Sequence, residues 1–258
     1  MIWHQGPPPY LTFARLGQGQ RHAVFTRLGG VSQGHLASLN QSLMVADDPT
    51  HVHENQRRAQ AVLHCVPEQV VNCQQVHGNH VAVVTAADGG GVVPATDGLV
   101  TADPDVVLTM RYADCVPVLL YCATRGVVGL AHAGWRGTVQ GVAAQTALVM
   151  MEAFDCLPHE ISAGIGPSIG PCCYEVGPQV VVAFATTFRD EGVIGAPTRH
   201  GHARIDLWQA NAAQLRAVGV RSIEVSCYCT CCHRDTFFSH RGDCGRTGRF
   251  AVYLGLLP

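Results

Sequence analysis

The chain has 258 residues, of which 47% are hydrophobic and 14% are charged, and its formal net charge is -2. This composition supports a packed core, and it excludes both the basic surface that nucleic acid needs and a polybasic patch for a membrane. Residues 1–9 lack a secretory signal, and no later run is apolar for long enough to cross a bilayer. We therefore expect a cytoplasmic protein with a small-molecule ligand.

The predicted elements alternate between helices and strands. Asp48-Pro49 provides an N-cap and a first helical proline for a helix ending near Leu63. Short β-branched apolar runs predict buried strands at 70–71, 81–84, 106–110, 116–121 and 127–131. Further helices are predicted from Thr138 to about Phe154 and from Asp206 to Val218. The pattern indicates a mixed α/β core. Because the chain has no repeats or long linkers, residues 1–258 are expected to form one domain. No sequence feature indicates the oligomeric state.

Three residues at the ends of apolar runs form a possible metal-binding set: His77, Cys115 and His132. Zinc prefers nitrogen and sulfur ligands, and a catalytic zinc keeps a fourth position open beside three protein ligands. On spacing alone, ordinary loop histidines and a buried cysteine are the simpler interpretation. Cys115 also has a second possible role, as a nucleophile with His77 or His132 as its base.

The chain has 12 cysteines, several of them neighbours, as in Cys172-Cys173 and the cluster Cys227–Cys232. Adjacent cysteines are poor disulfide partners, so free thiols in a reducing cytosol fit better. The tail cluster could bind a second metal, but a structural zinc usually needs a second knuckle, and the sequence shows none. We therefore expect one zinc per chain, and zinc occupancy that is unchanged when Cys231 or Cys232 is replaced.

Six segments, in family order, resemble the signature blocks of the YfiH-like family, which is also labelled polyphenol oxidase, multicopper laccase-like or peptidoglycan-editing factor. The segments are Gln74–Gly78 (QQVHG), Thr96–Thr101 (TDGLVT), Ala113–Leu119 (ADCVPVL), Ala131–Gly137 (AHAGWRG), Gly164–Val176 (GIGPSIGPCCYEV) and Phe237–Arg241 (FFSHR). The resemblance extends from about Phe25 to the C-terminus.

This resemblance implies an α+β fold of the CNF1/YfiH-like cysteine hydrolase type, with layered mixed β-sheets and outer helices. It implies a zinc-dependent purine nucleoside phosphorylase that cleaves adenosine, inosine and methylthioadenosine with phosphate and also deaminates adenosine. The metal would be Zn2+, with copper as the alternative. His77, Cys115 and His132 would be both its ligands and the catalytic residues.

Two aspartates and one arginine near these residues are candidate substrate contacts. Arg136 precedes a predicted helix, whose N-terminal N–H groups could help it to hold phosphate. Asp114 could instead orient a metal-binding histidine, or be a turn residue at a strand end. Asp97 could accept a substrate hydroxyl or orient a histidine, although Asp-Gly is also a common turn signal.

The family pattern suggests a loop over the substrate in which Arg27 and Asn40 meet the ribose or base. The chain departs from the pattern here. Met44 and Ala46 stand where a His-Val-Gly-Asp-Asp string is expected, and Gln56-Arg57 blurs the usual Asn-Arg. Arg57 is our choice for the ligand-binding arginine.

Other functions stay open at this stage. Histidine and cysteine also suit a copper-dependent polyphenol oxidase, which needs a multinuclear site with several histidines. Amide hydrolysis of a peptidoglycan precursor is a further possibility. The non-enzymatic alternative is a zinc-stabilised interaction protein, for which an open ligand set is poorly suited.

Overall fold

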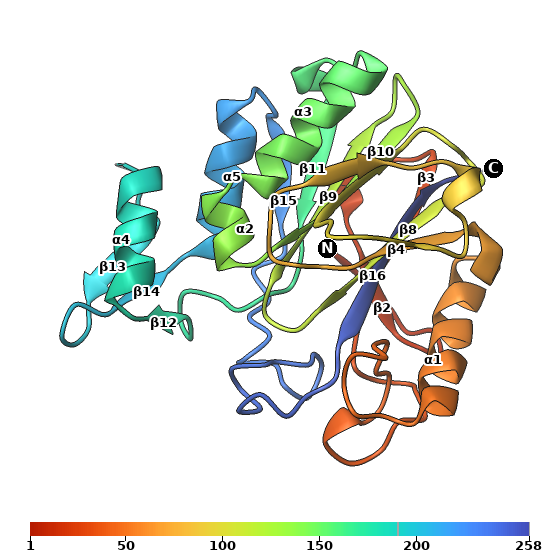
Figure 1. Ribbon diagram of the computed structural model, residues 1–258, viewed down its shortest axis with the longest axis horizontal. Coiled ribbons are helices and arrows are strands. Elements are labelled where there is room, and N and C mark those ends of the chain that lie inside the picture. The colour runs from red at the N-terminus through yellow and green to blue at the C-terminus, as the bar shows by residue number, and fades with distance from the viewer. Residues whose placement is uncertain (190, 258) are drawn as a thin grey trace.

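The computed structural model describes residues 1–189 and 191–257. Two large sheets form its centre, with helices on both outer sides (Figure 1). The seven-stranded sheet has the order β1 (Ile2–His4), β2 (Tyr10–Thr12), β3 (Gln20–Phe25), β16 (Phe250–Leu256), β8 (Val107–Tyr112), β4 (Val70–Cys73) and β6 (Val92–Val93). The six-stranded sheet has the order β15 (Ser222–Val225), β11 (Ile161–Ile165), β9 (Val116–Cys122), β10 (Val127–Ala133), β7 (Gly98–Thr101) and β5 (Val81–Val83).

A small sheet and five helices complete the described fold. The three-stranded sheet has the order β12 (Glu175–Val176), β14 (Ala203–Ile205) and β13 (Ile194–Pro197). The helices are α1 (Pro49–Val62), α2 (Trp135–Val139), α3 (Val142–Phe154), α4 (Pro178–Thr187) and α5 (Leu207–Ala217). The small sheet and α4 stand to one side of the two large sheets (Figure 1).

Alternation along the strands explains the layers. In β16, Val252 and Leu254 point into a buried cluster between the two large sheets, where they meet Leu119 of β9 and Leu130 of β10. The alternate residue Tyr253 faces the other way, into the cluster that α1 covers. Successive side chains of a strand point to opposite faces, so a wholly apolar strand such as β16 must be covered on both.

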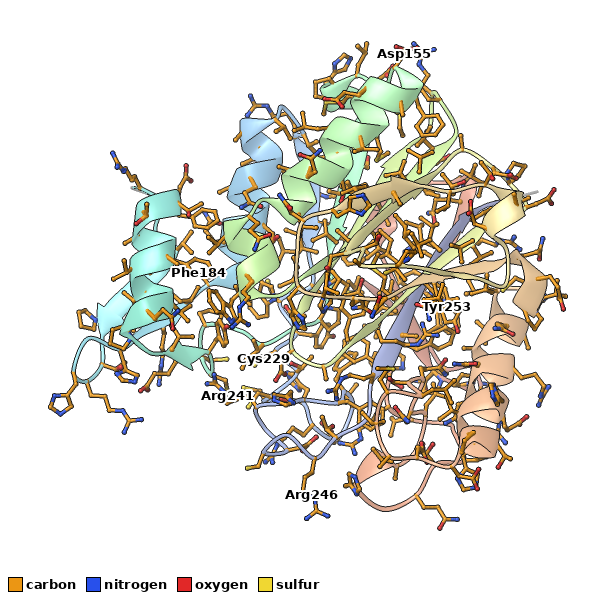
Figure 2. The ribbon with its side chains drawn as sticks, in the orientation of Figure 1. Asp155, Phe184, Cys229, Arg241, Arg246 and Tyr253 are labelled. Carbon is orange, nitrogen blue, oxygen red and sulfur yellow. The ribbon has the colours of Figure 1, made fainter. Side chains whose placement is uncertain are left out.

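The opposite face of the six-stranded sheet is covered by helices α3 and α5. Val118 and Leu120 of β9 pack there in one cluster with Ala147 of α3 and Leu215 of α5. Phe184 of α4, labelled in Figure 2, is fully buried in the same cluster. The layers therefore run from α1 through the two sheets to α3 and α5, which confirms the α+β prediction of layered sheets with outer helices.

Most predicted elements are present. Helix α1 begins as expected, because the Asp48 side chain accepts a hydrogen bond from the Thr50 N–H. All five predicted strands form, as β4, β5, β8, β9 and β10, and α5 has Asp206 as its N-cap. The prediction that one helix starts at Thr138 was wrong, because Gly141, at φ 83°, separates the short α2 from α3.

The sequence did not reveal the strands at the two ends of the chain. The last strand, β16, pairs with both β3 and β8, and so lies inside the seven-stranded sheet rather than at its edge. Within residues 1–189 and 191–257, no helix is both long and apolar enough to cross a membrane.

Candidate metal centre

The structure brings the three predicted ligands together at one end of the two sheets. The donor atoms of His77, Cys115 and His132 all lie within 4.8 Å of one another. The rings of His77 and His132 are 4.9 Å apart between centroids and are nearly perpendicular, at 74°. This separation allows three donors to reach one ion while their rings stay out of van der Waals conflict.

Each of the three predicted ligands owes its position to a different local structure. His132 is in β10, on the strand face that also presents Leu130 to the core between the sheets, and it is only 3% exposed. Cys115 follows Asp114, whose φ of 84° turns the chain sharply between β8 and β9. His77 lies in the loop after β4, itself at φ 62°, and is exposed. Two of the three ligand positions thus depend on left-handed backbone that few non-glycine residues adopt.

Asp97 organises this centre from beneath. It is fully buried, and its carboxylate accepts hydrogen bonds from the backbone N–H groups of Val76, His77 and Gly78 at 2.8–3.0 Å. Its Oδ1 also accepts a bond from His132 Nδ1, at 2.8 Å. The same carboxylate therefore fixes the His77 loop and holds the His132 proton on Nδ1, which leaves Nε2 free for a metal.

The charges at this centre are arranged for an ionised thiol. Burial opposes ionisation of Cys115, but the positive charge of His132 and hydrogen bonds from both histidines outweigh it and lower the pKa of Cys115 to about 6. Burial also disfavours charged His132, yet Cys115 and Asp97 raise its pKa to about 9. The pKa of Asp97 is lowered, because bonds from His132 and from backbone N–H groups outweigh burial. Metal ions bind the thiolate form of cysteine, so these surroundings favour the form of Cys115 that a metal needs.

Gly134 leaves the space that this arrangement requires. A Cβ atom at this position would lie 2.9 Å from His77 Cδ2 and 3.0 Å from Cys115 Sγ. A Cβ on Gly137 would similarly lie 2.9 Å from the Gly78 carbonyl oxygen. The segment that follows β10 therefore packs directly on the other two predicted ligands and on Gly78, and both glycines serve close approach rather than flexibility.

Asp114, next to Cys115, holds the C-terminal loop, residues 226–249 between β15 and β16, against the centre. Its Oδ1 accepts bonds from Thr230 Oγ1 at 2.6 Å and Ser239 Oγ at 2.7 Å, and its Oδ2 accepts the Arg241 N–H at 2.6 Å. Among the described residues, none of the hydrogen bonds to this carboxylate comes from a histidine side chain. Its position indicates that it fixes the polar segments around residues 230 and 241 beside Cys115, which sequence reasoning did not foresee.

A pocket of about 580 Å3 is lined by residues connected to this centre, although His77, Cys115 and His132 are not themselves part of its lining. Its wall includes Trp135, which follows Gly134, and Arg241, which is anchored to Asp114. Tyr174 also lines it, half-buried, and the Arg241 guanidinium lies 5.4 Å from its ring centroid. Burial, followed by the negative charge of Cys115, raises the pKa of Tyr174. The volume is in the usual range for a small-molecule site.

The predicted phosphate contact Arg136 is not among the residues that line this pocket, but it lies against Trp135, which is. Its guanidinium is 4.4 Å from the centroid of the Trp135 ring, and its side chain is exposed. It is the second residue of α2, which has only five residues. The positive charge here therefore comes from the arginine far more than from aligned helix dipoles, which need several turns to add up.

The other predicted contacts are engaged elsewhere in the fold. Arg27 donates to the carbonyl oxygens of Ala37 and Arg234, so it joins two loops. Asn40 is fully buried and accepts the Arg249 N–H. Arg57 forms a two-point ion pair with Glu54 on the exposed side of α1. Asp97, as described above, has its oxygens occupied by backbone and His132.

The residues that line the pocket were largely missed as site residues. Tyr174 and Arg241 were part of the resembling segments, and Arg241 and Arg249 also belong to a C-terminal stretch whose arginines could form an anion-binding edge or a solvated charged turn. Arg249 lies in the field of both Cys115 and Asp114, although burial outweighs these charges and lowers its pKa. These residues come from chain segments that local patterns cannot relate to His77 or His132.

The fold and the donor cluster define an α+β protein with a candidate metal centre at the end of two packed sheets. The chain belongs to the family described as multi-copper polyphenol oxidoreductase laccase, whose model matches residues 21–257. This confirms the resemblance to the YfiH-like family.

Relatives and solved structures agree with this assignment. The chain is 40% identical over 260 residues to purine nucleoside phosphorylase YlmD of Geobacillus stearothermophilus, which covers 97% of this chain and 92% of the relative. It is 37% identical over 234 residues to purine nucleoside phosphorylase YfiH of Escherichia coli, covering 90% and 92%. The crystal structure of YlmD from Geobacillus stearothermophilus superposes with a TM-score of 0.93 at 38% identity, covering 99% of this chain and 98% of that one.

Proposed function

We propose that this protein is a zinc-dependent purine nucleoside phosphorylase that cleaves adenosine, inosine and methylthioadenosine with phosphate and also deaminates adenosine in the cytoplasm. The main support is the open group of His77, Cys115 and His132, which lies beside a pocket large enough for a nucleoside. The activity named for the relatives from Geobacillus stearothermophilus and Escherichia coli supports the same reaction class.

The chemistry of the donors supports zinc at this centre. Two imidazoles and one thiolate match the ligands of catalytic zinc sites, and three ligands leave one position for a substrate oxygen. Zinc bound there would supply a Lewis acid toward phosphate or water. Copper remains the less suitable ion, because a multinuclear oxidase centre needs more imidazoles than the two that converge here.

The pocket supplies the groups that a nucleoside and phosphate need. Trp135 and Tyr174 present aromatic surfaces on which a purine would stack. The Arg241 guanidinium lies 5.4 Å from the Tyr174 ring centroid and that of Arg136 lies 4.4 Å from the Trp135 ring centroid, so each aromatic residue has a cation beside it that would attract phosphate. Asp97 accepts a hydrogen bond from His132 Nδ1, and this bond would hold His132 in place while substrate and product exchange.

Product analysis tests this proposal. Inosine and adenosine are incubated with the purified protein, with and without phosphate, and the products are separated by chromatography. We expect free base and ribose 1-phosphate only when phosphate is present, and inosine from adenosine. Free ribose at an unchanged rate would indicate hydrolysis. If no purine nucleoside releases its base, the proposal fails, and amide hydrolysis or phenol oxidation becomes the better hypothesis.

A pair of arginine variants tests the phosphate site within this reaction. Arg136→Ala should raise the KM for phosphate by one to two decades, because a hydrogen bond to an anion contributes about 1.5–3 kcal/mol. Arg57→Ala is the matched control, since Arg57 is paired with Glu54 on α1. Zinc content should stay at the wild-type level in both. An unchanged phosphate KM in Arg136→Ala would remove this residue from the site.

A further inference from the structure

A second group of metal-binding side chains lies outside the centre described above. The Sγ atoms of Cys172, Cys173, Cys229 and Cys232 all lie within 4.8 Å of one another. Cys232 Sγ is 3.6 Å from Cys172 Sγ and 3.4 Å from Cys173 Sγ. Figure 2 labels Cys229 and Arg241 in this region, where the C-terminal loop approaches β12.

These distances suit four ligands of a single ion. Sulfur atoms joined in a disulfide are about 2.05 Å apart, and all four of these cysteines are free. With a metal–sulfur distance of about 2.3 Å, a tetrahedron of thiolates around zinc has edges of about 3.8 Å. Iron–sulfur clusters contain several metal atoms and set their cysteines farther apart. The spacing of the four sulfurs therefore matches one tetrahedral ion.

The fold builds the group from two turns. Strands β11 and β15 are parallel neighbours, with Ile165 opposite Val225, so the chain leaves both strands at the same edge of the sheet. Cys172 and Cys173 follow β11, whereas Cys229 and Cys232 follow β15. The second pair has the Cys-x-x-Cys spacing of a zinc knuckle, and the first pair is the missing partner that the sequence alone did not reveal.

The backbone between the two turns is already fixed. Ser168 N–H donates to the Tyr228 carbonyl oxygen at 3.2 Å, and Thr230 N–H donates to the Ser168 carbonyl oxygen at 3.0 Å. Gly170 N–H lies 3.2 Å from Cys229 Sγ and donates to it. An N–H group directed at a buried sulfur stabilises a thiolate, and such outer bonds are typical around metal-bound cysteines.

Access and charge also fit a metal ion. Cys172 and Cys232 are exposed, so an ion can enter from solvent, whereas Cys229 is buried at the base of the group. The Arg241 guanidinium donates to the Cys173 carbonyl oxygen at 3.3 Å. This cation lies beside a group that would have a net charge of about -2 with four thiolates around Zn2+.

We propose that Cys172, Cys173, Cys229 and Cys232 bind one zinc ion in a closed, structural site. On binding, each thiol gives up its proton to solvent and no redox change occurs. The ion ties the turn before Tyr174 to the turn containing Thr230, whose hydroxyl donates to Asp114. It thereby stiffens the pocket wall near the catalytic centre. The proposal does not depend on the nucleoside reaction, and it revises the expectation of one zinc per chain.

Elemental analysis of the full chain, purified without added metal or chelator, tests the site. We expect two zinc ions per wild-type chain, and one in Cys172→Ser, in Cys232→Ser and in Cys115→Ala. Cys227→Ser is the matched control, because Cys227 is an exposed tail cysteine outside the group, and it should keep two. One zinc in the wild type that persists in Cys232→Ser would overturn the proposal, as would iron in place of zinc.

Two measurements identify the ligands independently of activity. Cobalt(II) added to metal-free protein should give the intense visible absorption of a tetrathiolate complex in wild type and Cys115→Ala but not in Cys232→Ser. In wild-type protein, zinc should protect Cys172 and Cys232 from iodoacetamide, as detected by peptide mass spectrometry, so the test does not require any variant to fold. Equal alkylation of both thiols with and without zinc would contradict the site.

Discussion

The role of Asp97 can be tested by replacing one oxygen atom with nitrogen. Asp97→Asn keeps the size of the side chain but removes its charge and one of its two acceptor oxygens. If the remaining oxygen stays with His132 Nδ1 and the His77 N–H, the new NH2 group faces the N–H groups of Val76 and Gly78, which now bond to Oδ2. Donors then face donors in a fully buried place.

The magnitude follows from the number of bonds affected. A hydrogen bond to a charged group contributes about 1.5–3 kcal/mol, so losing two of them lowers the free energy of unfolding by about 3–6 kcal/mol. One bond acts directly on a ligand, since the neutral amide holds His132 less firmly than the carboxylate does. We therefore expect zinc affinity to fall about 10–100-fold, as is usual when an outer partner of a ligating histidine is changed.

Zinc affinity is measured by competition with a chromophoric chelator, and stability by urea unfolding. The parent protein and each variant also have Cys232→Ser, so that the tail cysteines do not bind zinc. The matched control is Asp103→Asn, because Asp103 also accepts backbone N–H bonds, two against three at Asp97, but follows β7, whereas Asp97 precedes it. Zinc affinity within threefold of the parent and an unchanged unfolding midpoint in Asp97→Asn would refute the role assigned to this carboxylate.

Three further predictions follow from the same geometry. Gly134→Ala should lower zinc occupancy, measured by elemental analysis, because its Cβ would lie 2.9 Å from His77 Cδ2 and 3.0 Å from Cys115 Sγ; full occupancy would contradict the close approach. Between pH 6 and 9 the metal-free centre pairs ionised Cys115 with protonated His132, so zinc must displace one proton. Affinity at this centre, measured with the chelator, should therefore rise about tenfold per pH unit in that window and level off above it, whereas a flat profile would exclude the raised pKa of His132. Arg57→Ala should change the KM for inosine less than twofold in a turnover assay, because this side chain is 69% exposed and already paired along α1; a tenfold increase would place it at the substrate.

Local sequence determined the elements whose signals lie within a few residues. Asp48-Pro49 fixed the start of α1 through a bond to the Thr50 N–H, and Asp206 did the same for α5. The β-branched runs predicted β8, β9 and β10 because a strand covered on both faces is apolar at nearly every position. Family resemblance then selected His77, Cys115 and His132 as ligands, where spacing alone favoured ordinary residues.

Only the tertiary structure decided what surrounds those ligands. Asp97 bonds to His132, 35 residues later in the chain, and Asp114 bonds to Arg241, 127 residues later. The Cys172 turn meets Cys232 because β11 and β15 pair side by side, a contact across 60 residues. No local periodicity records such pairings, since they depend on how sheets associate after the strands have formed. The sequence therefore predicted His77, Cys115 and His132 as metal donors. Strand pairing determined which side chains orient these donors and which cysteines lie together.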